Sequence, residues 1–188
     1  MELKQYIQKF KLYLFEDVFS FEARFLWDEE NLYAQWSIID GIYVSPPEGQ
    51  FMFLSDSTCL NIDPLLAKLP SRAPGCEMLI GMPDGEGEIF CTHAPALADG
   101  TKIVGYPDNS RLSGRVTMEK TPNGRIVTAE IPWSEITPRK VCAGDHMGIT
   151  TCAINDEGDG AVDNMQWPWP PVLGGWLFPD QWGVLALI

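Results

Sequence analysis

Basic residues are scarce in this sequence. Lys and Arg number 13 against 26 Asp and Glu, which gives a formal net charge of −13 at pH 7. Such a surface repels a phosphate backbone, and the densest basic stretch holds only Arg139 and Lys140. The composition therefore excludes nucleic acid and anionic membranes as partners, and it favours a sugar, a metal ion or an uncharged surface.

Signals for membrane insertion, export and catalysis are also missing. No apolar run approaches the roughly 18 residues of a transmembrane helix, and the N-terminal stretch lacks the apolar core and cleavage site of a signal peptide. The two histidines, His93 and His146, stand in unrelated contexts without a nucleophile elbow, phosphate loop or zinc motif. The sequence thus predicts a protein that is not an enzyme.

The five cysteines include no CxxC pair and show no metal-ligand spacing. Cys59 and Cys152 stand inside apolar, strand-like runs, where cysteine behaves as a small hydrophobic residue. We expect free core thiols and no disulfide framework.

Short strands and frequent turns dominate the hydrophobic pattern. The 17 glycines and 15 prolines are spread along the chain, and the apolar residues alternate with period two in many short segments. Strands are expected at 21–28, 32–40, 51–63, 76–82, 88–94, 114–120, 125–133, 145–156 and 182–188, and Asn123-Gly124 is the strongest hairpin signal. Residues 1–15 fit either a short helix or the start of a strand, and 63–69 and 133–136 each fit one helical turn. Residues 1–188 are therefore expected to form a single all-β domain, an antiparallel, jelly-roll-like β-sandwich with little helix.

Hard oxygen ligands gather in the stretch "INDEGDGAVDN", which begins at Ile154. Its glycines allow the backbone to turn carbonyl groups inward, as calcium requires of a loop. An EF-hand is excluded because its register puts Gln166 where a bidentate glutamate is needed. An irregular structural Ca²⁺ site and a plain solvated loop both remain open. The metal candidates are Asp156, Glu157, Asp159 and Asp163.

Three tryptophans follow in "DNMQWPWPPVLGGW". Sugar rings stack their C–H faces on aromatic rings, and their hydroxyl groups pair with planar polar side chains. The alternative is that these rings cap the end of the sandwich. The candidate ligand-binding residues are Trp167, Trp169, Trp176, Asn155, Asn164, Gln166 and Trp133. Trp27, Trp36 and Trp182 lie in strand patterns and are expected in the core.

The order of several motifs resembles that of the family 9 carbohydrate-binding modules and their relatives in the DOMON-like sandwich superfamily. The resemblance covers residues 23–188 and runs through "ARFLWDEENLYAQWSIID", "SDSTCLNID", "VTAEIPWSEI", "AGDHMGITTCAINDEGDG" and "PDQWGVLALI". It implies a β-sandwich that clamps a sugar between aromatic rings, with structural calcium common. The second ring of such a clamp is not fixed by the motifs, and Trp36, Tyr43 and Trp133 are candidates.

The resemblance implies a non-catalytic carbohydrate-binding module, secreted or on the cell surface and covalently linked to the catalytic domain of a polysaccharide-degrading protein. Two alternatives stay open. Some members of the superfamily bind haem for electron transfer, and His93, His146 and the seven methionines include residue types that ligate haem. A glycan-active hydrolase or lyase with a carboxylate pair is the other.

Overall fold

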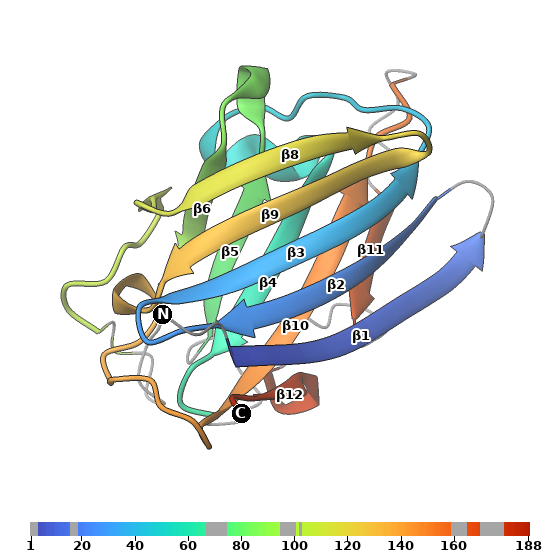
Figure 1. Cartoon of the computed structure of the whole chain (residues 1–188). Coiled ribbons are helices and arrows are strands. Elements are labelled where there is room, and N and C mark those ends of the chain that lie inside the picture. The colour runs from blue at the N-terminus through green and yellow to red at the C-terminus, as the bar shows by residue number, and fades with distance from the viewer. Residues whose placement is uncertain are drawn as a thin grey trace.

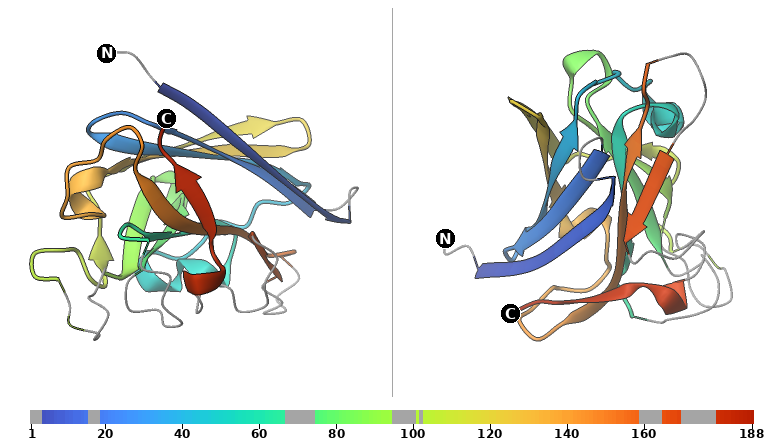
Figure 2. Two further views of the ribbon diagram at one scale, coloured as in Figure 1. Left: turned by 90° about the horizontal axis from the view of Figure 1, so that it is seen from below. Right: turned by 90° about the vertical axis from the view of Figure 1, so that its right-hand side faces the viewer.

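Two antiparallel β-sheets pack face to face as a sandwich (Figures 1 and 2). The computed structural model describes residues 4–15, 19–66, 75–94, 101, 103–158, 165–169 and 179–188, with the backbone alone at 4–15, 165–169 and 179. Sheet A has the strand order β1-β2-β3-β9-β8, and sheet B has the order β11-β10-β4-β5-β6-β7, with β12 also paired to β10. The predicted all-β sandwich is confirmed.

The strands of sheet A are β1 (Lys4–Phe15), β2 (Phe19–Trp27), β3 (Asn31–Asp40), β8 (Arg115–Thr121) and β9 (Gly124–Pro132). Those of sheet B are β4 (Ser57–Asp63), β5 (Cys76–Gly81), β6 (Glu88–His93), β7 (Ser110–Arg111), β10 (His146–Asn155), β11 (Met165–Trp169) and β12 (Gly183–Ala186). Within the described ranges, helix occurs only as the 3-10 turns η1 (Gly49–Leu54), η2 (Pro83–Gly85), η3 (Trp133–Glu135) and η5 (Pro179–Gln181). None of the described helices is long and apolar enough to cross a membrane.

The expected hairpins form where the turn chemistry predicts them. At the β8–β9 turn, a side chain on Gly124 would lie 2.0 Å from the carbonyl oxygen of Ile38, so only glycine fits there. Two expectations need correction. Residues 4–15 form a strand and no helix, because pairing with β2 overrides the helical spacing of their apolar residues. Residues 51–63 are not one strand, because η1 occupies the first part and β4 begins only at Ser57.

The core lies between the sheets. Alternation along β2 and β3 turns aromatic and aliphatic side chains inward, and the expected core residues Trp27, Trp36 and Trp182 are at most 5 % exposed. Trp36 of sheet A donates its indole N–H to Thr151 Oγ1 of sheet B at 2.8 Å. This hydrogen bond joins the two sheets inside the core.

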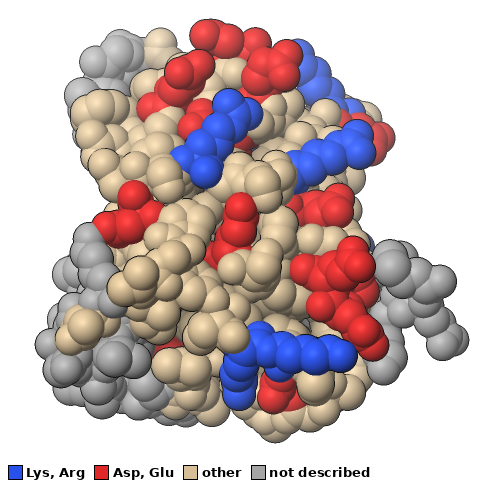
Figure 3. All heavy atoms as spheres, turned by 90° about the vertical axis from the view of Figure 1, so that its left-hand side faces the viewer, with Lys and Arg blue, Asp and Glu red and all other residues tan. Residues whose placement is uncertain are grey.

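Acidic side chains are spread over the surface. Figure 3 shows one side of the molecule, where Asp and Glu side chains are interspersed with a few Lys and Arg side chains. The visible part of the described surface has no concentrated basic patch, in line with the net charge of −13.

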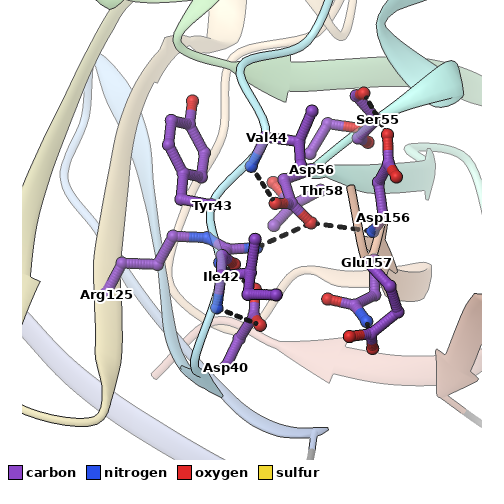
Figure 4. Close-up of polar contacts among 12 residues, drawn as sticks. Asp40, Ile42, Tyr43, Val44, Ser55, Asp56, Thr58, Arg125, Asp156 and Glu157 are labelled. Atoms are coloured by element: carbon purple, nitrogen blue, oxygen red, sulfur yellow. Dashed lines mark hydrogen bonds and ion pairs between the residues drawn. The ribbon is translucent and has the colours of Figure 1, made fainter. Parts of the chain in front are cut away.

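A buried arginine joins the sheets at one end of the sandwich (Figure 4). Arg125 of β9 forms ion pairs with Asp40, at the end of β3, and with Asp56, just before β4. The Arg125 Nη2–Asp56 Oδ1 distance is 3.3 Å, and the guanidinium lies 5.1 Å from the centre of the Tyr43 ring. All three charged side chains are at most 3 % exposed, so each depends on the others for charge compensation.

Asp56 also holds two loops through backbone hydrogen bonds. Its carboxylate accepts the N–H of Val44 at 2.6 Å and that of Asp156 at 3.0 Å. Burial raises the pKa of Asp56 to about 6, although Arg125 and the two backbone donors act in the opposite direction. The folded protein therefore holds a proton on Asp56 more tightly than the unfolded chain does.

Replacing Arg125 with Met should lower the free energy of unfolding by about 3–5 kcal/mol, because two buried carboxylates lose their counter-charge. Urea unfolding followed by tryptophan fluorescence measures the loss. Arg115→Met is the matched control, since it removes an exposed arginine from the neighbouring strand β8 and should change stability by less than about 0.5 kcal/mol. Equal losses in the two variants would contradict the proposed role of Arg125.

Asp56→Asn should change how stability depends on pH. Because the folded pKa of about 6 lies above the ordinary aspartate pKa of 3.8, the contribution of Asp56 is present at low pH and is lost as pH rises from about 4 to about 6. The unfolding free energy of the parent protein, minus that of Asp56→Asn, should therefore fall over this interval by on the order of 2–3 kcal/mol. Urea titrations of both proteins from pH 4 to pH 7 test this, and a constant or rising difference contradicts it.

Candidate functional site

A row of polar residues crosses the outer face of sheet B, the face turned away from the core. In the strand register, Thr150 of β10 lies opposite Asn61 of β4, Asn61 lies opposite Glu77 of β5, and Glu77 lies opposite His93 of β6. A β-bulge between β5 and β6 brings Thr92 beside the same glutamate. We call Thr150, Asn61, Glu77, Thr92 and His93 the polar row.

The polar row differs in exposure from one end to the other. Thr150 and Asn61 are buried, whereas Glu77, Thr92 and His93 are partly exposed. Thr92 Oγ1 lies 2.9 Å from Glu77 Oε1 and donates a hydrogen bond to it. This contact fixes the carboxylate of Glu77 on the sheet surface.

An apolar row runs beside the polar row. Cys152, Cys59 and Leu79 lie opposite one another on β10, β4 and β5, and Phe90 of β6 lies opposite Leu79. Met52 of η1 packs on this row in a second hydrophobic cluster, separate from the main core. The outer face of sheet B thus carries a covered apolar strip beside a partly open polar one.

The polar row was not predicted from the sequence. Asn61, Glu77 and Thr150 are far apart in the chain, and no motif marks them. A usable signal exists only for Glu77, because it is the one charged residue of β5, whose other residues are apolar. The register between strands is needed to bring Asn61, Glu77 and Thr150 together.

The loop after β10 contains the described part of the predicted calcium stretch. Asp156 accepts hydrogen bonds from Ser55 Oγ at 2.7 Å and from the Gly158 N–H at 2.9 Å (Figure 4). Because the Asp156 N–H also donates to Asp56, this loop is attached to the Arg125 ion pairs. Asn155 is buried and donates its Nδ2 to Glu157 Oε1 at 2.7 Å.

Metal binding at this loop depends on residues beyond its described part. Within the described ranges, no three His, Cys, Asp or Glu side chains form a group that could hold a metal ion. The buried Oδ1 of Asn155, however, has no hydrogen-bond partner among the residues that the structure describes, and such a carbonyl oxygen fits a hard cation. The candidate residues Asp159, Asp163, Asn164 and Trp176 lie outside the described residues.

Trp167 and Trp169 belong to a short edge strand, β11, where a loop was expected. Pro168 is compatible with this strand because it stands at the edge of the sheet. The register puts Trp167 opposite Ala153 and Trp169 opposite Thr151, and Ala153 and Thr151 face the core. Gln166 lies opposite Ile154, a residue of the outer apolar cluster.

Of the three candidates for the second ring of a clamp, Trp36 and Trp133 are buried and Tyr43 is partly exposed. Trp36 is fully buried. Trp133, also predicted as a ligand-binding residue, is only 4 % exposed and donates its indole N–H to the Asp28 carbonyl oxygen at 3.0 Å, so it is a core residue. Tyr43 lies beside Arg125 and lines a cavity of about 320 Å³ between the chain after β3 and the β8–β9 turn.

Comparison by sequence gives no relatives, since no family model and no curated protein matches the chain. Solved structures do match. A family 9 carbohydrate-binding module from Caldicellulosiruptor kristjanssonii, in complex with cellotriose, has a TM-score of 0.64 at 12 % identity, covering 96 % of this chain and 82 % of that one. The same kind of module in complex with glucose has a TM-score of 0.64 at 15 % identity, with coverage of 99 % and 84 %.

A third structure is a protein from Bacteroides uniformis to which carbohydrate binding is ascribed. It has a TM-score of 0.62 at 11 % identity, covering 98 % of this chain and 87 % of that chain. At such low identities the likeness concerns the fold alone. This chain therefore has the fold of the family 9 carbohydrate-binding modules.

Proposed function

We propose that this protein is a non-catalytic carbohydrate-binding module, and that the sugar lies on the outer face of sheet B over the open end of the polar row. The observation that carries the proposal is the alignment of hydroxyl, amide, carboxylate and imidazole groups across four neighbouring strands. Sugar hydroxyl groups both donate and accept hydrogen bonds, so they match such a row. The likeness to sugar-binding modules adds support.

Glu77 is the central hydrogen-bonding residue in this proposal. Its carboxylate accepts a hydrogen bond from Thr92 Oγ1, and the side chain is partly exposed on the outer face. Hydrogen bonds to a charged acceptor are stronger than neutral ones. Because Glu77 is fixed on a strand, little conformational entropy is lost when a ligand binds.

We assign the aromatic platform to Trp176. The strand β11 ends at Trp169, opposite Thr151, and β12 begins at Gly183, opposite Ile149. The chain that joins these two points therefore starts and ends on either side of Thr150, at the end of the polar row opposite His93 and two strands away from Glu77. It carries Trp176, whereas Trp167 and Trp169 are in register with core-facing residues. Of the three candidate tryptophans Trp167, Trp169 and Trp176, we therefore propose Trp176 as the ring that contacts the sugar.

We also propose a structural Ca²⁺ in the loop after β10. Asn155 Oδ1 and the carboxylates of Asp156 and Glu157 would supply oxygen ligands, and Asp159 and Asp163 would complete the set. The buried Oδ1 of Asn155, which has no hydrogen-bond partner in the described part of the chain, supports this proposal. Carboxylates that accept one hydrogen bond per oxygen keep lone pairs for a cation. The cation would offset the local negative charge and hold the start of the segment that leads to β11.

A covalently linked catalytic domain and a secreted or cell-surface location remain predictions for this chain. Modules of this fold are often joined to catalytic domains that degrade polysaccharides, and a secreted or cell-surface location follows from that role. Binding of glycan without its cleavage is the activity proposed for this chain.

A glycan panel that includes glucose, cellotriose and cellulose tests the proposal, with Kd measured by calorimetry for each soluble glycan that binds. Glu77→Gln should weaken binding by about 10- to 100-fold, because a charged hydrogen-bond acceptor is lost. Trp176→Ala should weaken it at least about tenfold through loss of ring stacking.

Two exposed residues supply the controls. Glu119→Gln removes an exposed carboxylate from β8. Phe51→Ala removes an aromatic ring from η1, and Phe51 is 52 % exposed. Both variants should bind as the parent protein does. The proposal fails if no glycan binds to folded protein, or if Glu77→Gln and Trp176→Ala bind normally. Release of sugar products would contradict a non-catalytic role, and a haem absorption band in the purified protein would favour the electron-transfer alternative.

Calcium should raise the melting temperature, because a ligand that binds only the folded state stabilises it. Thermal unfolding in about 1 mM CaCl₂ is compared with unfolding in a chelator and in MgCl₂. A calcium concentration of about 1 mM exceeds the Kd of most structural calcium sites. A rise of a few degrees with Ca²⁺ is expected, and Asp163→Asn should remove it. Asp84→Asn, an exposed carboxylate at η2, is the control. Identical melting in calcium and chelator contradicts the proposed site.

A further inference from the structure

Two thiols meet in the core between β5 and β6. The Sγ atoms of Cys76 and Cys91 are 3.8 Å apart, and both residues are 0 % exposed. They belong to the main core cluster, together with Met78 on β5. All five cysteines are free thiols in this structure, as the sequence predicts.

The strand geometry around this pair allows the sulfur atoms to approach each other. Cys91 lies opposite Met78. The bulge at Thr92 shifts the register between Met78 and Glu77, next to Cys76. A disulfide requires an S–S distance of about 2.05 Å, so the two atoms must close by roughly 1.8 Å. A bulge increases local twist and interrupts the ladder, so small changes in side-chain and backbone torsion angles are easier there than in a regular pair.

A second thiol pair on the other face of sheet B lacks this freedom. Cys59 and Cys152 lie directly opposite each other on β4 and β10, within an unbroken register, and β4 is paired on both sides. Sulfur hydrogen bonds do not distinguish the two pairs, because Cys59 Sγ accepts one from Asn61 Nδ2 at 3.3 Å and Cys91 Sγ donates one to the Pro107 carbonyl oxygen at 3.2 Å. Cys142, the remaining cysteine, is exposed and has no thiol partner among the residues described.

We propose that Cys76 and Cys91 are a disulfide-forming pair that closes during oxidative folding and cross-links β5 to β6. The oxidant is a small-molecule disulfide such as oxidised glutathione. One cysteine thiolate attacks it, forms a mixed disulfide and releases one reduced glutathione. The second cysteine thiolate then attacks the protein sulfur of the mixed disulfide and releases the second glutathione. The protein loses two hydrogen atoms, and its two electrons reduce the small disulfide to two thiols.

Burial of the two thiols determines at which stage of folding the disulfide forms. The hydrogen bond with Cys91 and burial both raise the pKa of the Cys76 thiol, so the reactive thiolate is rare in the folded protein. A mixed disulfide with glutathione also has no space inside the core. The reaction therefore takes place before the two sheets pack, and the finished cross-link is protected from reductants.

The cross-link lies directly beneath the polar row. Glu77 follows Cys76, and Thr92 follows Cys91, and these neighbours point to the outer face, where they are hydrogen-bonded. Closing the pair would hold the two strands that carry Glu77 and Thr92 in one register. This proposal does not depend on what binds there.

The test is refolding of the reduced, denatured full chain in a glutathione redox buffer, followed by intact mass measurement. The expected product is two hydrogen atoms lighter than the reduced protein, and alkylation after denaturation labels three thiols instead of the original five. Digestion with trypsin and a glutamate-specific protease cuts between Cys59 and Cys76 at Arg72, and between Cys76 and Cys91 at Glu77, Glu86 and Glu88, so the linked peptides identify the pair. The oxidised form should melt about 5–10 °C higher than the reduced form.

Variants separate this pair from the others. Cys76→Ala and Cys91→Ala should each lose the mass change, whereas Cys59→Ala should keep it. If the core variants do not fold, the peptide map of the parent protein decides alone. Five free thiols after refolding, or a link between Cys59 and Cys152, would overturn the proposal.

Discussion

The unbroken register of β4 against both β10 and β5 determines what each face of sheet B carries. Because side chains alternate with period two, one residue of slippage would exchange the two faces completely. In the observed register, Leu60 and Ile62 enter the core, while Cys59 and Asn61 lie on the outer face. The polar row, the apolar row beside it and the separation of the two thiol pairs all follow from this single pairing.

The buried charges at the end of the sandwich have a different role. Arg125 fixes the end of β3 and the start of β4, and Asp56 extends that attachment to the loop after β10. Hydrophobic packing alone would hold the sheets together but would leave these loops free to move. The ion pairs give them defined positions, and the predicted calcium stretch begins at the place so defined.

The sequence predicts much of the fold and less of the site. Period-two alternation and the Asn123-Gly124 turn locate the hairpins, and the aromatic residues of β2 and β3 reveal the core. Residues 4–15 mislead because their apolar spacing suits a helix as well as a strand, and only pairing with β2 decides. The polar row cannot be found from local pattern, since Thr150, Asn61 and Glu77 meet only through long-range register. Trp167 stands in a polar, proline-containing segment that suggests a loop, yet it pairs with Ala153 at the edge of sheet B.

The edge strand β8 has a consequence for association between molecules. One side of β8 pairs with β9, and the other side has no partner strand in the described part of the chain, so it is an edge to which another chain's strand can add. Arg115, Glu119 and Lys120 are exposed along it. An incoming strand would have to remove these charges from water or accept like charges opposite them, so the charged side chains disfavour the addition of another strand at this edge.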